Sequence, residues 1–277
     1  MCLVLIAWQS HPDYPLIVAA NRDEFYARKT RAASWWGQSV SMLSGRDEEA
    51  GGTWLGFNRQ GRFCALTHVR LPTERNAYAP SRGGIVVSAL QSADPAVQFS
   101  RQLGERAKHF NGFNLLTADV GLQGGRRASL VYTSNRLAPM PRVLMPGIYG
   151  LSNAFLDTPW PKVTSSVARF SLQVAGGVDP AAFFRLLADR HTVADGQLPS
   201  TGVSLAWERA LSAVQVRALG YGTRSSTVLT VRNDGLVSFI ERSFDAEQPD
   251  RYADRHYEFV LDHQVRQSGD VDLQSDH

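Results

Sequence analysis

The sequence contains few of the residues that mark several common classes of protein. Cysteine occurs only twice in 277 residues, at Cys2 and Cys64, so we expect neither a disulfide framework nor a paired-cysteine zinc motif. Lysine occurs three times, and most of the positive charge behind the net +3 is arginine scattered between carboxylates. Binding to nucleic acid needs basic residues gathered on one face, so we expect no nucleic-acid partner.

Long apolar runs are also missing. No window reaches the roughly 18 apolar residues of a membrane helix, and residues 1–8 lack the basic leader and the length of a secretory signal. We therefore expect a cytoplasmic protein without a transmembrane segment. A 43% hydrophobic and 20% charged composition favours one domain over residues 1–264, with two domains as the less favoured alternative. Residues 265–277 are polar and aperiodic, and we expect a frayed tail there.

Motifs of the common enzyme classes are absent from the sequence. It has no glycine-rich dinucleotide or phosphate loop, no H-E-x-x-H zinc motif and no G-x-S-x-G serine motif. The seven histidines show no i, i+4 pairing. We therefore expect no metal site and no required cofactor.

The apolar patterns that are present predict strands and helices in alternating blocks. Hairpins are expected over residues 2–8 and 16–20, 53–58 and 62–69, and 225–232 and 236–242, the last across Asn233-Asp234-Gly235. A long polar connection carrying Trp35 and Trp36 should separate the first two. Single strands are expected over 112–118, 129–133 and 147–153, and helices over 81–90, 94–108, 162–174, 180–189 and 203–214. This order favours antiparallel sheets flanked by helices.

Cys2 is the strongest candidate for a reactive residue. Removal of Met1 by the housekeeping aminopeptidase would leave Cys2 with both a thiol and a free α-amine. The α-amine titrates near 7.7 to 8.0, so it can take the thiol proton at neutral pH. A guanidinium favours the thiolate, and a carboxylate can hold the amine. Arg22 and Asp23 follow the strand expected to pair with that of Cys2, which brings them beside it.

A structural interpretation of the same residues is favoured by the pattern alone. On pattern alone, Asn21-Arg22-Asp23-Glu24 is more often a solvated turn with a surface ion pair, and a cysteine at position 2 is usually a small strand residue. Cys64 is expected to be core packing. Trp35, Trp36 and Trp54 can line a hydrophobic substrate mouth, although core packing is the safer expectation for at least two of them.

Eight segments in order along the chain resemble the NRDE family, also called the transport and Golgi organisation protein 2 family. They are MCL at 1–3, NRDEF at 21–25, AGGTWLG at 50–56, NGFNLL at 111–116, YGLSN at 149–153, TPWPK at 158–162, LPSTG at 198–202 and YGTRSST at 221–227. The resemblance implies an α+β fold, the four-layer αββα sandwich of N-terminal-nucleophile hydrolases. Its N-terminus is similar to the cysteine branch that includes penicillin V acylase and conjugated bile acid hydrolase.

The resemblance also implies roles for particular residues. Cys2 would be the nucleophile, Arg22 and Asp23 its flanking charges, and Asn153 a donor to the oxyanion; a strand-end turn residue is the alternative for Asn153. Candidate supporting residues are His68, Arg224 and Asn21. His68 stands where the family more often has Asn, and a neutral imidazole can also donate, although a solvated or structural histidine fits the sequence equally well.

Three functions follow from the resemblance. The favoured one is an N-terminal cysteine amidohydrolase or acyltransferase acting on a small amide or thioester, or on an acyl-lipid substrate. The alternative is a non-catalytic binding or trafficking protein on the same fold, with haem or an acyl lipid as hydrophobic cargo. The third is a scaffold with a vestigial site.

Overall fold

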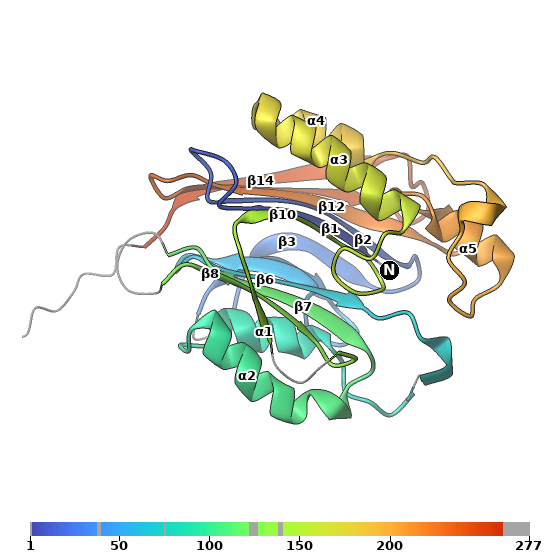
Figure 1. Ribbon diagram of the computed structural model, residues 1–277, viewed down its shortest axis with the longest axis horizontal. Helices are drawn as coiled ribbons and strands as arrows, with labels where there is room; N and C mark the ends of the chain where they lie inside the picture. The colour runs from blue at the N-terminus through green and yellow to red at the C-terminus, as the bar shows by residue number, and fades with distance from the viewer. Residues whose placement is uncertain (1, 38–39, 75, 122–126, 138–140, 263–277) are drawn as a thin grey trace, which may run out of the picture.

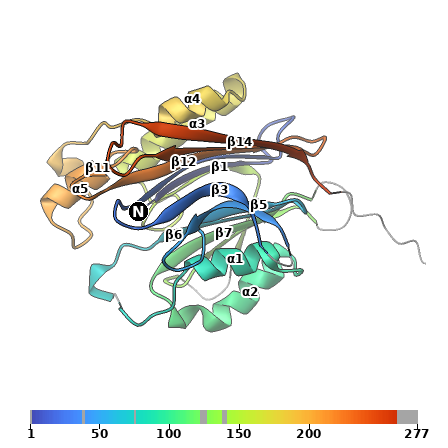
Figure 2. The same ribbon diagram turned by 180° about the vertical axis from the view of Figure 1, so that it is seen from behind.

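The computed structural model describes residues 2–37, 40–74, 76–121, 127–137 and 141–262. Two antiparallel sheets pack face to face, and helices cover the outer face of each sheet (Figure 1 and Figure 2). This architecture confirms the predicted α+β fold with four αββα layers. The expected tail over 265–277 lies outside the described residues. Among the described helices, none combines the length and the apolar character needed to cross a membrane.

The first sheet has the N-terminal hairpin in its interior. Along the sheet the strands run in the order β10-β1-β2-β12-β13-β14, and the short β11 pairs with β12. Helices α3 and α4 cover its outer face (Figure 1). The bounds are β1 (Cys2–Trp8), β2 (Leu16–Phe25), β10 (Gly147–Leu151), β11 (Arg217–Ala218), β12 (Tyr221–Val231), β13 (Leu236–Phe244), β14 (Tyr252–Val260), α3 (Pro161–Gly176) and α4 (Pro180–Leu187).

The second sheet follows the chain order from β3 to β9. Helices α1 and α2 cover its outer face, and α5 lies at the end of the first sheet (Figure 2). The bounds are β3 (Thr30–Trp36), β4 (Met42–Asp47), β5 (Leu55–Asn58), β6 (Arg62–His68), β7 (Phe113–Asp119), β8 (Ser129–Ser134), β9 (Arg142–Leu144), α1 (Gly83–Gln91), α2 (Ala96–Arg106) and α5 (Leu205–Leu211), with 3-10 turns at Pro72–Glu74, Ala107–His109 and Asp195–Gln197.

We expected a long polar connection before the second hairpin, and this expectation was wrong, because the segment contains β3 and β4. The register of this pair shifts between Arg31 and Ser34, so the apolar alternation that would reveal a strand is broken. Arg31 also faces solvent, where it forms an ion pair at 2.7 Å with Glu48, the residue directly after β4. A strand with an irregular register and one charged face resembles a loop in the sequence.

The expectation for the end of β2 was also wrong, because the strand continues to Phe25. Asn21, Arg22 and Asp23 lie within it and are 1%, 5% and 2% exposed. The solvated turn that the pattern favoured is therefore a buried part of the sheet. Charged side chains are rarely buried without partners, so this stretch marks the candidate site.

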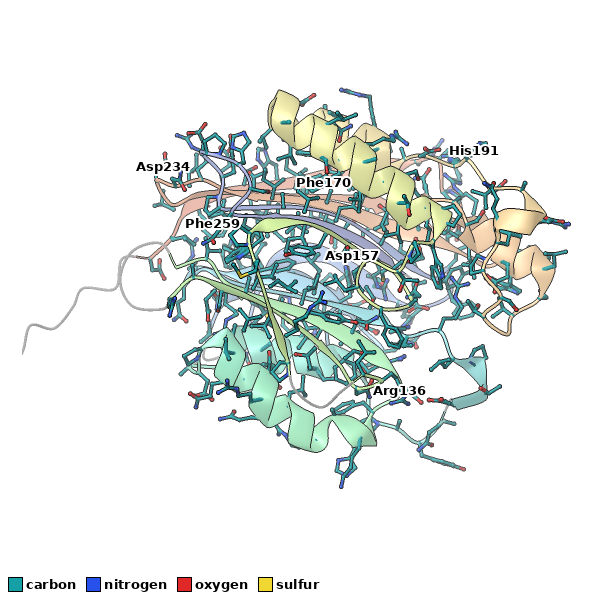
Figure 3. All side chains as sticks on the ribbon, viewed as in Figure 1. Arg136, Asp157, Phe170, His191, Asp234 and Phe259 are labelled. Carbon is teal, nitrogen blue, oxygen red and sulfur yellow. The ribbon has the colours of Figure 1, made fainter. Side chains whose placement is uncertain are left out.

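The side chains of β1 alternate between the two faces of the sheet, and this alternation determines where Cys2 points. Leu3 and Leu5 pack under α3 and α4, whereas Val4 and Ile6 face the second sheet. Both faces of β1 are therefore buried, as its uninterrupted apolar run predicts. Figure 3 shows side chains filling both spaces. Because side chains alternate along a strand, Cys2 lies on the same face as Val4, between the two sheets.

Candidate functional site

Cys2 lies in the wall of a cleft at one end of the sandwich. The cleft has a volume of about 790 Å³, and its lining includes Cys2, Arg22, Asp23, His68 and Asn153. Cys2 pairs directly with Arg22 across β1 and β2. The antiparallel register of the hairpin thus brings together residues that are 20 positions apart in the sequence.

Burial dominates the environment of the Cys2 thiol and raises its pKa above the usual value. The negative charge of Asp23 raises this pKa further, whereas the hydrogen bond from the Asp23 backbone N–H and the charge of Arg22 lower it. The balance favours the neutral thiol at neutral pH. A thiol in this state needs a base close by before it can attack a carbonyl.

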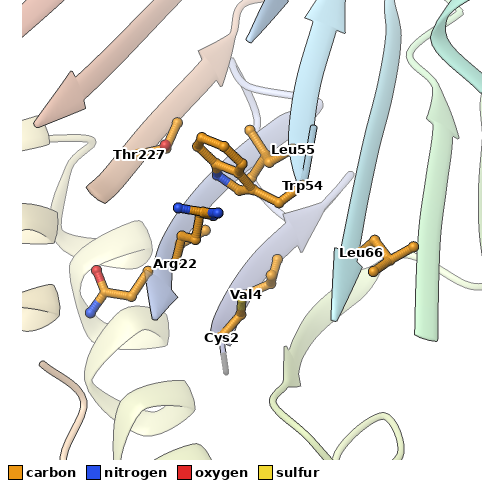
Figure 4. A pocket seen from close by; sticks show the side chains of 9 residues that line it. Cys2, Val4, Arg22, Trp54, Leu55, Leu66 and Thr227 are labelled. Carbon is orange, nitrogen blue, oxygen red and sulfur yellow. The ribbon is translucent and has the colours of Figure 1, made fainter. Parts of the chain in front are cut away.

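Arg22 is fixed between the two sheets. Its Nη1 donates to Thr30 Oγ1 at 2.9 Å, and its guanidinium stacks 4.2 Å from the centre of the Trp54 ring. Figure 4 shows Arg22 and Trp54 beside the strand that carries Cys2. Glu24 lies 3.8 Å from Nη2. A cation held in this way has little freedom to leave the neighbourhood of the thiol.

Asp23 lies on the opposite face of β2 from Arg22, as alternation requires. Its Oδ1 accepts a hydrogen bond of 2.6 Å from Thr223 Oγ1 on β12. Burial raises the pKa of Asp23, and the charges of Lys162 and Arg22 act against this effect. Cys2 therefore has the guanidinium on one side and the carboxylate on the other.

Asn153 connects Cys2 to the second sheet. It is 1% exposed, its Oδ1 accepts from the Cys2 nitrogen at 3.1 Å, and its Nδ2 donates to the His68 carbonyl at 2.9 Å. Asn153 thus holds the nitrogen that would become the α-amine. One of the two amide hydrogens expected to serve an oxyanion is directed here at the His68 carbonyl.

His68 ends β6 in the cleft wall. Burial and the positive charges of Arg82, Arg22 and Arg28 hold the pKa of its imidazole well below the usual range. The ring is therefore neutral at pH 7 and retains one N–H donor.

Two other candidates lie away from the cleft. Asn21 Nδ2 donates to the carbonyls of Leu187 and Val214, at 2.8 and 2.9 Å, on the helix side of the sheet. Arg224 lies at an irregularity of the β2–β12 register, and its Nη1 donates to the carbonyls of Phe25, Tyr26 and Arg28, each at 3.0 Å. The structure does not place either residue in the cleft lining.

The tryptophans and the second cysteine divide between the cleft and the core. Trp54 lines the cleft, whereas Trp35 packs edge-on against Phe259 with ring centres 4.9 Å apart. Trp36 Nε1 donates to Ser44 at 2.9 Å. Cys64 is fully buried, and burial raises the pKa of its thiol to about 12. It is a core residue, as expected from the sequence.

Sequence reasoning missed several residues around the site. Tyr221 Oη donates to the Asp23 carbonyl at 3.0 Å, and Tyr221 and Trp207 form an aromatic wall of the cleft. Lys162, quoted above only as part of a motif, is a buried lysine near Asp23. A lysine directly after the proline that starts a helix is an unusual choice, and this was the available signal.

No cluster suited to a metal ion is found in the described part of the chain, where three or more His, Cys, Asp or Glu side chains would have to gather. The groups that converge on the cleft are instead a thiol, a guanidinium, a carboxylate and an amide. This set suits proton transfer and the stabilisation of charge.

Solved structures give only a distant match. The C2A mutant of conjugated bile acid hydrolase from Clostridium perfringens aligns with a TM-score of 0.48 and 9% identity, covering 97% of this chain and 100% of that one. An N-acylethanolamine-hydrolyzing acid amidase orthologue from Caenorhabditis elegans gives a TM-score of 0.41 at 11% identity, over 82% of this chain and 92% of that one.

Curated sequences match far more closely. The Transport and Golgi organization protein 2 homolog of Bos taurus is 37% identical over 278 residues, covering 94% of this chain and 99% of the relative. The Homo sapiens homolog is 35% identical with the same coverage. The family model described as Transport and Golgi organisation 2 matches residues 1–246. The chain therefore belongs to the Transport and Golgi organisation 2 family.

Proposed function

We propose that the protein is an N-terminal cysteine amidohydrolase or acyltransferase that acts on a small amide or thioester. The observation that carries the proposal is the surroundings of Cys2. Its nitrogen is held by Asn153, its thiol accepts from the Asp23 backbone, and it lies in the cleft with Arg22. A nucleophile, a nitrogen that can act as its base, and two charges meet at one residue.

The proposed reaction begins after removal of Met1. The α-amine of Cys2 takes the thiol proton as Sγ bonds to the substrate carbonyl carbon, and the carbonyl oxygen gains the electron pair. The proton then passes to the leaving nitrogen as the C–N bond breaks, or to the leaving sulfur of a thioester. Water or another acceptor attacks the resulting acyl-cysteine, which releases the acid or the transferred product and restores the thiol.

The surrounding residues would support these steps. Arg22 favours the thiolate, Asp23 holds the protonated amine, and neutral His68 offers an N–H to the oxyanion. Asn153 keeps the amine in position, and because the His68 carbonyl takes only one of its two Nδ2 hydrogens, the other would serve the oxyanion. One well-placed oxyanion donor typically contributes about 3 to 4 kcal/mol to the transition state.

The test is acylation of Cys2 in protein whose intact mass shows that Met1 is gone. An acylating probe should label the wild type once, turnover of an amide and thioester panel should be measurable, and C2A should abolish both. C64A is the matched control and should label normally, because Cys64 is fully buried. Labelling that persists in C2A, or native protein that retains Met1, would refute the assignment.

A binding function is the second candidate, and the aromatic lining of the cleft favours it. Trp54, Trp207 and Tyr221 offer flat apolar surfaces near the thiol, which suit a hydrophobic cargo such as haem or an acyl lipid. Haem titration separates the two proposals. A spectral change that disappears in C2A, together with no turnover of the amide panel, favours the carrier; the reverse favours the enzyme.

A further inference from the structure

Lys162 occupies a position that is unfavourable for a cation in two respects. It is the second residue of α3, where the helix dipole presents its positive end, and its side chain is only 5% exposed. Its Nζ donates to the Leu211 carbonyl at 2.8 Å, and a neutral donor would serve that bond equally well. A buried charge placed against the helix dipole points to a role beyond packing.

The charges that act on Lys162 all belong to the candidate site or its border. They are the Asp23 carboxylate, the Cys2 thiol, the Arg70 guanidinium and the Glu208 carboxylate. Glu208 is occupied elsewhere, because Oε2 lies 2.7 Å from Arg70 Nη1 and Oε1 accepts from the nitrogen and hydroxyl of Thr201. Asp23 is therefore the carboxylate whose charge Lys162 chiefly balances.

The proposed function makes specific demands on Asp23. The carboxylate must stay ionised to hold the protonated α-amine of Cys2, yet it is 2% exposed and burial favours its neutral form. Arg22 is directed to the other face of β2, toward Trp54. A second cation on the helix side of the sheet meets this demand, and Lys162 extends from α3 to that side.

We propose that Lys162 is a positioning residue of the Cys2 site, whose ammonium keeps Asp23 ionised and favours ionisation of the thiol. The inference rests on the proposed function. Burial lowers the pKa of Lys162 to about 8, so the ammonium form predominates at pH 7 and this support declines above pH 8. The competing explanation is a structural one, in which Lys162 only ties α3 to the last residue of α5 through the Leu211 carbonyl.

Two substitutions separate these roles. K162Q removes the charge but keeps a donor for the Leu211 carbonyl, whereas K162M removes both. K108Q is the matched control at an exposed lysine outside the cleft lining. The measurement is the rate at which iodoacetamide alkylates Cys2 between pH 5 and 10 in full-length protein trimmed of Met1, with C2A as the blank. The pH midpoint of this rate needs no substrate.

If the charge matters, the midpoint in K162Q and K162M should rise by about one pH unit, and alkylation at pH 7 should slow about tenfold. K108Q should match the wild type. A wild-type midpoint in K162Q would overturn the proposal, whether or not K162M is altered. If K162Q does not fold, the midpoint in K162M decides, since an unchanged value there also excludes a charge effect.

Failure of the proposed function would look different. In that case wild-type protein would be alkylated at Cys2 but would neither become acylated nor turn over any amide or thioester, whatever the midpoint in K162Q. An unshifted K162Q midpoint in a protein that does turn over the panel would refute the role of Lys162 alone.

Discussion

The molecule contains two buried groups of charges, and they are built differently. Arg62 and Asp119 pair in the second sheet at 2.7 Å, and both are no more than 1% exposed. Arg62 also donates to the carbonyls of Ala89 and Asp94, and Asp119 accepts from the Ala96 nitrogen at 2.7 Å. This group ties β6 and β7 to α1 and α2.

The other group surrounds Cys2 in the first sheet. Arg22 and Asp23 point to opposite faces of β2, and the charge of Lys162 acts on Asp23 from a helix rather than from a neighbouring strand. Burial shifts the pKa values of the Cys2 thiol, Asp23 and Lys162 away from their usual ranges. We therefore expect the Arg62 group to stabilise the fold, whereas the buried charges around Cys2 should lower its stability, as is common at functional sites.

The largest expected effect on stability comes from breaking the Arg62 group. R62L leaves Asp119 buried without its cation, so the free energy of unfolding should fall by about 3 to 5 kcal/mol. Urea denaturation followed by circular dichroism measures the change. Arg62 lies at the opposite end of β6 from His68, which lines the Cys2 cleft. The alkylation rate of Cys2 in the folded R62L protein should therefore not change.

The double variant R62L/D119L supplies the control. Replacing both charges with apolar groups removes the uncompensated carboxylate, so much of the stability should return. A loss below about 1 kcal/mol in R62L would contradict the distinction between the two groups. So would a double variant that is no more stable than the single one.

The next effect has the opposite sign and concerns Lys162. Its folded-state pKa of about 8 lies below the ordinary 10.5, so the charged form opposes folding below pH 8 by an amount on the order of 3 kcal/mol. K162M should therefore raise the free energy of unfolding at pH 7 by roughly 1 to 3 kcal/mol, since loss of the bond to Leu211 offsets part of the gain.

The pH dependence checks this origin of the gain. Between pH 8 and 10.5 the unfolded wild type binds a proton that the folded protein has lost, so wild-type stability recovers as the pH rises and the advantage of K162M shrinks. Urea denaturation at pH 7 and pH 9.5 measures both values, with K108M as the exposed control. A destabilised K162M would place Lys162 with Arg62 as a structural cation.

The sequence predicted those parts of the structure whose signals are local. The apolar runs of β1 and β2 indicated a hairpin buried on both faces, and Asn233-Asp234-Gly235 indicated the β12–β13 turn. Both signals are set by neighbouring residues. The sequence did not predict β3, because its register with β4 is irregular. It did not predict β14 either, because the charged residues Asp254, Arg255 and Glu258 alternate poorly with apolar ones there.

The candidate site was predicted only in part, for a related reason. The family resemblance indicated Cys2, Arg22, Asp23 and Asn153, and all four line one cleft in the structure. The sequence offered only a weak signal for Lys162, because its position relative to Asp23 depends on how α3, which begins 138 residues later in the sequence, packs on the sheet. Burial likewise depends on tertiary packing, and the short motif at 21–24 favoured a solvated turn for that reason.

The smallest effect tests the boundary between the two groups at His68, which lies in the second sheet but faces the cleft. Its folded-state pKa is well below the ordinary 6.5, so the unfolded chain binds a proton that the folded chain does not as the pH falls below about 6.5. Wild-type stability should then decrease by at most about 1.4 kcal/mol per pH unit, and H68N should lack this component. Denaturation at pH 7.0 and 5.5 measures it, with H191N as the exposed control. Asparagine keeps a neutral donor, so turnover of H68N should stay within tenfold of wild type; an unchanged pH dependence would mean that the imidazole is already solvated in the folded protein.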